Sequence, residues 1–155
     1  MKRKLLLWLL LLLWAVPSLC CGAQSLAEIG KTANCIAYVD EGNVAAIKKD
    51  GQIYMLVPLE EHYTNEAFLA RLRKSGAGME QAAMSVYLYM FNNDGTRYCI
   101  PTRFVADVEG KLCKDLGKDM VMKPVNNSRV LVKAYEAAYT VLERKQRLMK
   151  SMRGE

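Results

Sequence analysis

The chain is poor in the residues that most often carry catalysis or bind metal ions. Its 155 residues include a single histidine, His62, so a zinc motif with two histidines one helical turn apart is excluded. No two cysteines have the short separation that is typical of a structural zinc site. The glycine pair Gly76 and Gly78 lacks the lysine and the strand-to-helix setting of a phosphate-binding loop. We therefore expect no metal ion and no cofactor.

A strong charge of one sign is also lacking beyond the first residues. The formal net charge is +6, and Lys2, Arg3 and Lys4 supply half of it. The remaining excess is too small to indicate a nucleic acid, which we do not expect as a partner. The charge is uneven, because residues 129–155 hold seven basic and three acidic side chains. The rest of the chain after residue 23 is close to neutral.

The first 23 residues have the layout of a secretory signal. Three basic residues precede the apolar run Leu5–Val16, and small residues follow it. Cys21 and Ala23 place small residues at the −3 and −1 positions of a signal-peptidase site. We therefore predict cleavage after Ala23 and a mature chain that begins at Gln24, which would remove Cys20 and Cys21.

Two alternatives would keep the N-terminal segment in place. One is a lipid on Cys20 or Cys21, although neither is preceded by the residues that lipoprotein processing favours. The other is an uncleaved membrane anchor, although a spanning helix needs about 20 apolar residues and this run reaches that length only across Pro17. The prediction is a protein exported to the periplasm or the medium through a cleaved signal, with lipid or membrane anchoring as the alternative.

Residues 24–155 are long enough to form one domain with its own core. Two hairpins are predicted within it, because Asp50-Gly51 and Asp94-Gly95 each stand between runs that favour strands. Asp-Gly favours the type I′ turn of a tight hairpin. Counting outward from these turns gives a register of Ile47 opposite Tyr54, Phe91 opposite Tyr98, and Met90 opposite Cys99.

Helices are predicted in three places after the first hairpin. The first follows the cap candidates Thr64 and Asn65. The longest runs from Arg129 to about Met152. Another is predicted from Thr102, because apolar residues recur there at every fourth position, namely Phe104, Val108, Leu112 and Leu116.

Other local patterns complete the expected arrangement. Residues 25–34 have a partly helical spacing of apolar residues, and Pro58 and Pro101 are expected to end strands. The order of elements predicts an α+β domain. In it two β-hairpins form an antiparallel or mixed sheet that is packed by helices, and a basic amphipathic helix over residues 129–152 ends the chain.

The three cysteines after the signal are Cys35, Cys99 and Cys113. In an oxidising compartment one pair can close, and Cys99 with Cys113 is the candidate disulfide because the two are nearest in sequence. The alternative is that all three stay free as small buried residues.

A nucleophilic site would have to combine His62 with a thiol. Cys35 and Cys99 are the candidates, because a catalytic cysteine needs a base within hydrogen-bonding distance. The alternative is that His62 is an ordinary loop histidine, since it stands in the polar segment Glu60-Glu61-His62-Tyr63.

The C-terminal helix carries the clearest candidate for binding. Its first half has an apolar stripe that ends at Leu142 and is expected to pack on the domain. Beyond this stripe, basic residues surround a few apolar ones, a composition that suits an anionic membrane surface or a partner protein. The alternative is a solvated helix end. The candidate binding residues are Arg144, Lys145, Arg147, Leu148, Met149, Lys150 and Met152.

These observations favour a cell-envelope protein that binds another macromolecule and catalyses no reaction. The expected partner is an unidentified envelope protein or an anionic membrane surface. A small secreted enzyme of the Cys–His type is one alternative, and a periplasmic protein that binds a small ligand is another.

Overall fold

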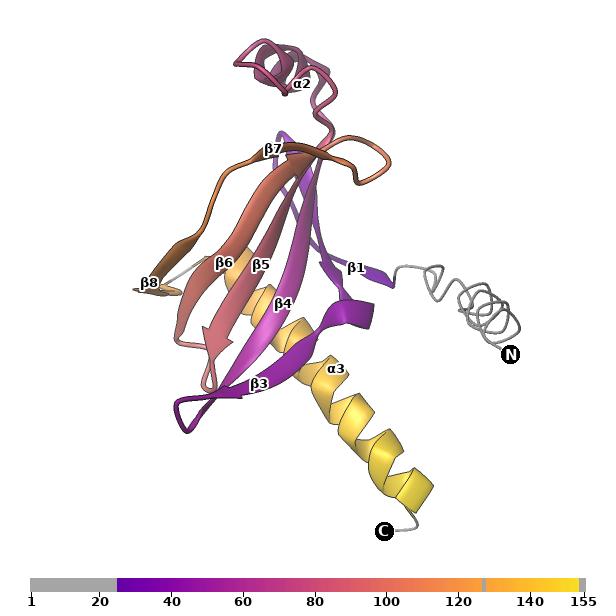
Figure 1. Ribbon diagram of the computed structural model, residues 1–155. Helices are drawn as coiled ribbons and strands as arrows, with labels where there is room; N and C mark the ends of the chain where they lie inside the picture. The colour runs from indigo at the N-terminus through magenta and orange to yellow at the C-terminus, as the bar shows by residue number, and fades with distance from the viewer. Residues whose placement is uncertain (1–24, 127, 154–155) are drawn as a thin grey trace, which may run out of the picture.

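The computed structural model describes residues 25–126 and 128–153. They form one eight-stranded sheet, two α-helices and one 3₁₀ helix (Figure 1). The α+β class and the long C-terminal helix are confirmed, and the sheet is antiparallel throughout. In chain order the elements are β1 (Leu26–Lys31), β2 (Cys35–Asp40), η1 (Glu41–Asn43), β3 (Ala45–Lys49), β4 (Gln52–Tyr63), α2 (Glu66–Arg73), β5 (Met84–Asn92), β6 (Arg97–Ala106), β7 (Leu112–Asp115), β8 (Asp119–Pro124) and α3 (Arg129–Arg153).

Two long strands, β4 and β6, each pair with two shorter strands along one edge. The strand order is β1-β2-β4-β5-β6-β7, with β3 also paired to β4 and β8 also paired to β6. On β4, residues 52–56 pair with β3 and residues 59–63 pair with β2. On β6, residues 97–100 pair with β8 and residues 104–106 pair with β7. The opposite edges of β4 and β6 both pair with β5, which lies between them.

The two prolines expected to end strands lie inside these long strands. Pro58 is in β4 at the point where β3 gives way to β2, and it pairs with neither of them. Pro101 is in β6 between the part that pairs with β8 and the part that pairs with β7. Proline is tolerated in a sheet where a ladder is interrupted, because it has no N–H to donate. The prediction that these residues end strands is therefore wrong.

Both predicted hairpins are present, with the predicted register next to each turn. Farther along the second hairpin a bulge between Leu88 and Met90 shifts the pairing of β5 with β6. Ile47 pairs with Tyr54, Phe91 with Tyr98, and Met90 with Cys99. Asp50 and Gly51 both have positive φ, of 50° and 78°, as a type I′ turn requires.

Residues 25–34, predicted to be partly helical, contain the edge strand β1 instead. A bulge between Glu28 and Gly30 shifts the pairing of β1 with β2. Ile29 lies at this bulge and is buried in the core. The bulge interrupts the alternation of a strand and leaves apolar residues at a spacing that looks helical.

The helix predicted from Thr102 is also wrong. Residues 102–106 continue β6, a turn follows, and Leu112 begins β7. Gly110 has φ of 81° in that turn, a value that favours glycine. A spacing of four residues is two periods of a strand as well as about one turn of a helix, so the apolar spacing did not distinguish them.

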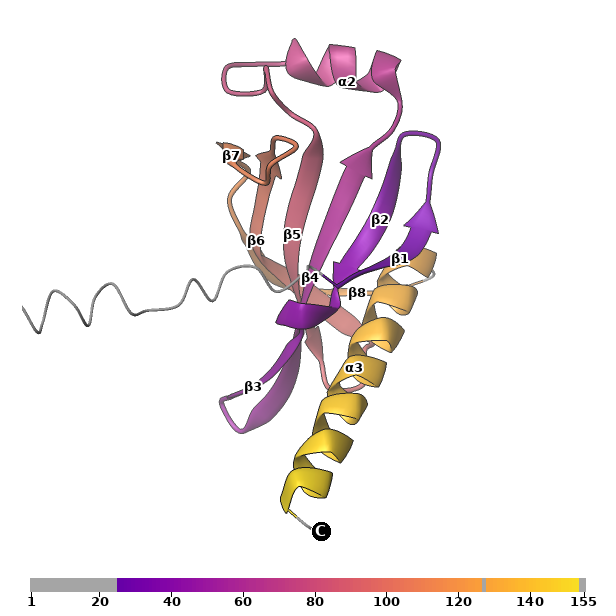
Figure 2. The ribbon, with the colours of Figure 1, turned by 90° about the vertical axis from the view of Figure 1, so that its right-hand side faces the viewer.

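The core lies between the sheet and α3. α3 lies along one face of the sheet, which we call the inner face (Figures 1 and 2). The opposite face is the outer face. Ser128 begins the helix by accepting a hydrogen bond on Oγ from the N–H of Leu131 at 3.4 Å. The largest fully buried side chains of the inner face come from three strands, and they are Val39, Val57, Leu59 and Phe91.

The remaining helix, α2, lies beyond the end of the sheet formed by β7 and the end of β4 (Figure 2). Asn65 caps it, because its Oδ1 accepts a hydrogen bond from the N–H of Phe68 at 3.0 Å, as predicted. The segment after α2 adds a small second core in which Met79 and Ala82 pack against Val105 of β6.

Candidate functional site

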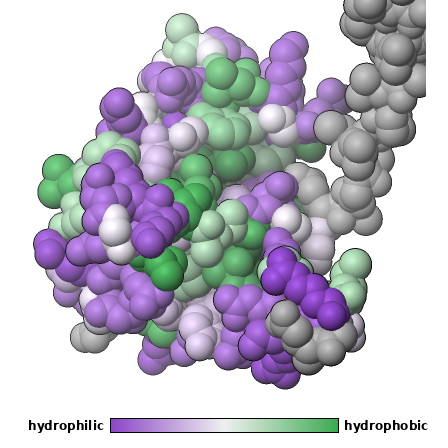
Figure 3. Space-filling view, turned by 60° about the horizontal axis from the view of Figure 1, so that its bottom comes forward, coloured by the Kyte–Doolittle hydropathy of each residue, from purple (hydrophilic) through white to green (hydrophobic). Residues whose placement is uncertain are grey.

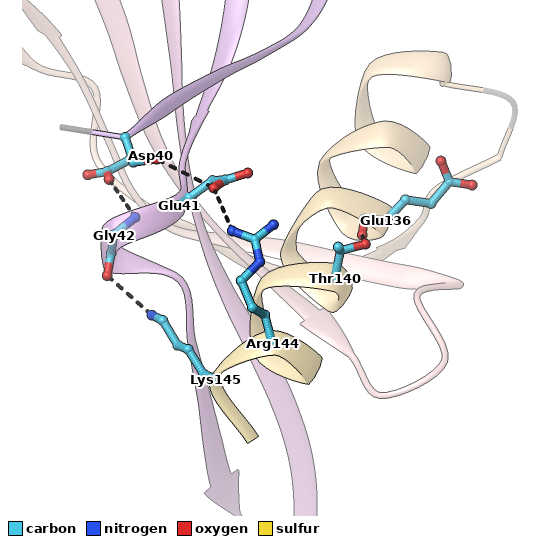
Figure 4. A network of polar contacts seen from close by, with 8 residues as sticks. Asp40, Glu41, Gly42, Glu136, Thr140, Arg144 and Lys145 are labelled. Carbon is cyan, nitrogen blue, oxygen red and sulfur yellow. Dashed lines mark hydrogen bonds and ion pairs between the residues drawn. The ribbon is translucent and has the colours of Figure 1, made fainter. Parts of the chain in front are cut away.

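The predicted inner stripe of α3 does pack on the domain. Its fully buried residues are Leu131, Ala134, Ala138 and Val141. The helix is held for one further turn beyond the stripe. There Lys145 donates to the carbonyl oxygen of Val44 at 2.9 Å and to that of Gly42 at 3.3 Å (Figure 4). These carbonyls close the 3₁₀ helix η1, and a cation suits that end of a helix.

Arg144 adds a second tie between α3 and η1. Its Nη1 lies 3.6 Å from Oε2 of Glu41 (Figure 4). The docked part of α3 therefore ends at Lys145. The apolar stripe had predicted that it ends at Leu142. Two of the predicted binding residues, Arg144 and Lys145, are partly engaged in holding the helix on its own domain.

The rest of α3, residues 146–153, extends past the sheet (Figure 1), and we call it the projecting end. All its residues are exposed. Its apolar side chains are 59% exposed at Leu148, 53% at Met149 and 88% at Met152. Exposed apolar residues are ordinary when scattered singly, but these three share one short segment.

The three apolar residues lie on one side of the projecting end. At about 100° per residue, Leu148, Met152 and Met149 fall within an arc of about 100°. Lys150 lies on the opposite side. Arg147 donates to Glu143 at 3.3 Å, one turn earlier. The projecting end is therefore an amphipathic helix with a narrow apolar side and a basic polar side. None of the helices that the structure describes has both the length and the apolar content of a membrane span.

The catalytic candidates are not brought together. His62 pairs with Ile36 on β2, next to Cys35, and neighbouring residues of a strand point to opposite faces. The buried thiol of Cys35 lies instead 3.2 Å from the hydroxyl of Thr32. The imidazole of His62 has Glu60 as its partner, with Nε2 2.7 Å from Oε2.

Cys99 is also far from His62. Cys99 pairs with Met90 of β5, and His62 pairs with Met84 of the same strand. Six residues of strand span about 20 Å, which is far beyond a hydrogen bond. The geometry therefore gives His62 neither of the two candidate thiols, Cys35 or Cys99, to activate.

The candidate disulfide is not formed, and Cys35, Cys99 and Cys113 are free thiols. Cys99 lies on the part of β6 that pairs with β8, whereas Cys113 lies on β7 beside Val105 and its partner Lys114. About six strand residues, or about 20 Å, separate the two sites, and a disulfide needs Cα atoms within about 7 Å. Burial raises the pKa of both the Cys99 and the Cys113 thiols.

A polar cluster that the sequence did not reveal lies on the inner face at the end nearest α2. The pairing places Glu61 beside Ser85, and Leu59 beside Tyr87. The hydroxyls of Tyr63 and Ser85 are 2.5 Å apart. The ring of Tyr89 follows that of Tyr87 along β5, with centroids 5.7 Å apart. We call these five residues, Glu61, Tyr63, Ser85, Tyr87 and Tyr89, the tyrosine cluster.

Burial sets the protonation of the tyrosine cluster. It raises the pKa of the Glu61 carboxyl above its usual value, and a hydrogen bond from Tyr87 lowers it in part. Burial and then the nearby charge of Glu61 raise the pKa of Tyr87 to about 12. Burial likewise raises the pKa of Tyr63 and Tyr89. The cluster therefore presents neutral hydroxyls and a carboxyl that holds its proton more tightly than an exposed one.

An excess of tyrosine is the only sign of this cluster in the sequence, and it is weak. Its members come from two strands whose pairing is fixed by the fold. None of their fully buried side-chain polar atoms lacks a hydrogen-bond partner. Among the described residues no group of three or more His, Cys, Asp or Glu is placed to hold a metal ion.

The outer face carries half-buried apolar side chains in its centre. By the strand register they include Ile36, Leu56, Leu88 and Phe104. In a space-filling view from the lower side of Figure 1, hydrophobic side chains gather in the middle of the surface and hydrophilic ones surround them (Figure 3).

Comparison with known proteins identifies no relative. No family model, no curated protein and no solved structure matches the chain.

Proposed function

We propose that this chain is an accessory protein of the cell envelope, exported through its N-terminal signal, that binds another macromolecule through the projecting end of α3. The observation that carries the proposal is the joint exposure of Leu148, Met149 and Met152 on a helix that is firmly docked up to Lys145. A helix that needed only to complete the core has no use for a further two turns that expose three apolar side chains.

The separation of His62 from Cys35 and Cys99 supports binding over catalysis by a Cys–His pair. The sheet register, and not the absence of a ligand, carries this argument. The basic side of the projecting end supports a partner with negative charge, because residues 146–153 hold three basic side chains and no acidic one.

The test uses the chain that begins at Gln24. Every described strand and helix lies between Leu26 and Arg153, so this chain retains the whole fold. The purified protein is mixed with the envelope fraction of the source cells and sedimented. The variant replaces Leu148, Met149 and Met152 with Gln, which keeps a good helix former at each position.

The matched control replaces three exposed apolar residues of β7 and β8, namely Leu112, Met120 and Val121, with Gln. We expect the unchanged chain and the control to sediment with the envelope, and the α3 variant to stay in solution. Equal sedimentation of the variant and the control would overturn the proposal, as would failure of the unchanged chain to sediment.

A further inference from the structure

The first described residue and the projecting end lie on the same side of the molecule. The carbonyl oxygen of Ser25 accepts a hydrogen bond from the N–H of Glu41 at 2.9 Å, and its hydroxyl lies 3.4 Å from Oε2 of Glu41. The same carboxylate oxygen lies 3.6 Å from Arg144. One side chain, Glu41, therefore joins the start of the described chain to the base of the projecting end.

The N-terminal segment joins the domain near the base of the projecting end, so a membrane that holds this segment is also within reach of the helix. The apolar run Leu5–Val16 ends nine residues before Ser25, a distance of at most about 30 Å. The projecting end extends about 12 Å beyond Lys145 at 1.5 Å per residue. If the segment is retained as an anchor, it therefore keeps the projecting end close to the bilayer. After the predicted cleavage at Ala23, the projecting end has to bind the bilayer by itself.

The composition of the projecting end favours a lipid surface over a protein groove. Helices that dock in protein grooves present apolar residues over two or more turns, whereas here they span only Leu148 to Met152. Three basic side chains and no acidic one accompany them in residues 146–153. A short apolar side with a basic polar side is the pattern of helices that lie in the membrane interface.

We propose that the projecting end of α3 lies on an anionic lipid bilayer, with Leu148, Met149 and Met152 below the headgroups and Arg147, Lys150 and Arg153 within the electric field of the anionic headgroups. This inference rests on the proposed function and names the partner. Arg153 borders the apolar side, and its long stem lets its charge reach the phosphates while that side is inserted. Arg147 and Lys150 lie farther round the helix and act through the field of the surface. Each basic residue near an anionic surface raises binding about fivefold, so the three together supply about 100-fold.

The test is sedimentation of the chain from Gln24 with protein-free vesicles. One set of vesicles contains phosphatidylcholine alone, and the other contains phosphatidylcholine with phosphatidylglycerol. The variant replaces Arg147, Lys150 and Arg153 with Gln. The matched control replaces Lys111, Lys114 and Lys118 with Gln, three exposed residues on β7 and its flanking turns, so the change in net charge is the same.

We expect the unchanged chain to bind the anionic vesicles only. The α3 variant should lose about 100-fold in affinity for them. The control should lose much less, because it changes only the net charge. Raising the ionic strength should weaken binding of the unchanged chain. Equal losses in the variant and the control would overturn the inference, because net charge alone would then explain binding.

The outcome also separates this inference from the proposed function. A chain that sediments with the envelope fraction through Leu148, Met149 and Met152, but not with anionic vesicles, has a protein partner. In that case the proposed function stands and the membrane inference fails. If the envelope experiment itself shows no dependence on these residues, the proposed function fails first.

Discussion

The ammonium group of Lys145 lies 2.9 Å from the carbonyl oxygen of Val44, which follows η1. This contact joins positions about 100 residues apart in the chain, and together with the contact to Gly42 it marks the last point at which α3 is held. It separates a part of the helix that serves folding from a part that is free for binding.

Replacing Lys145 with Met should therefore reduce stability. The two carbonyls would lose their charged donor, and the expected cost is about 1 kcal/mol. Thermal unfolding should show a decrease of about 3–5 °C in Tm for a domain of this size. Lys150→Met is the control, because Lys150 is exposed on the projecting end, and it should change stability by less than about 0.5 kcal/mol. Equal effects of the two changes would show that the Lys145 contacts contribute nothing.

Gly95→Ala should be more destabilising than Gly51→Ala, although both glycines stand in hairpin turns with positive φ. The strain of that conformation costs about 1–2 kcal/mol at either site. A Cβ at Gly95 would lie 2.7 Å from Cε1 of Tyr135, whereas nothing lies within 4 Å of one at Gly51. Tyr135 must then shift and weaken the hydrogen bond from its hydroxyl to the carbonyl of Asn93.

Urea denaturation measures this difference, which we expect to be about 1–3 kcal/mol. In a Tyr135→Leu background the excess cost of Gly95→Ala should disappear. An excess that persisted in this background would assign the cost to the hairpin alone and would contradict the contact with α3.

Glu61→Gln should stabilise the protein at neutral pH and leave it unchanged in acid. The folded state binds the Glu61 proton more tightly than the unfolded chain, because burial raises its pKa above 4.5. As pH rises through 4.5 the unfolded state ionises first, so stability is lost from there up to the folded pKa and the loss is constant above it. Below 4.5 both states are protonated and there is no loss.

Thermal unfolding at several pH values between 4 and 7 checks this prediction. The difference in Tm between Glu61→Gln and the unchanged chain should grow over this range. Glu109→Gln, at an exposed turn, is the control and should show no such growth. A constant difference would mean that the Glu61 carboxylate is solvated well enough to ionise normally.

The chain from Gln24 should contain three free thiols. A thiol reagent in denaturant should titrate Cys35, Cys99 and Cys113, and in native buffer Cys113 should react first because the other two are buried. The raised pKa of Cys113 should make this reaction slower than that of a small-molecule thiol at the same pH, since the thiolate is the reactive form. A count of one thiol in denaturant would indicate a disulfide that the structure does not contain.

Local signals predicted the parts of the fold that depend on a few neighbouring residues. The Asp50-Gly51 and Asp94-Gly95 turns fix their hairpins, since the turn determines which residues face each other. Asn65 predicted the start of α2 through its side chain. The apolar stripe of α3 predicted its docked face, but its end at Lys145 depends on carbonyls of η1, which no helical pattern can reveal.

Tertiary context decided the parts that were missed. Pro58 and Pro101 would normally end strands, and they are tolerated only because two outer strands meet beside each of them. The predicted helix after Thr102 failed because the spacing of Phe104 and Leu112 fits both a strand and a helix. The tyrosine cluster needs the alignment of β4 with β5, so no single segment of the sequence contains it.

Pro58 and Pro101 together divide the sheet into two leaves. In one leaf β3 and β8 flank the hairpin tips, and in the other β2 and β7 lead toward α2 and the tyrosine cluster. The register of each outer strand is set by the half of β4 or β6 that it pairs with. β5 also runs through both leaves, but it contains no proline and pairs with β4 and β6 only. The outer strands and their turns can therefore be lengthened in one leaf without changing the register of the outer strands in the other, whereas the unbroken ladder between β4 and β5 fixes the two leaves to each other.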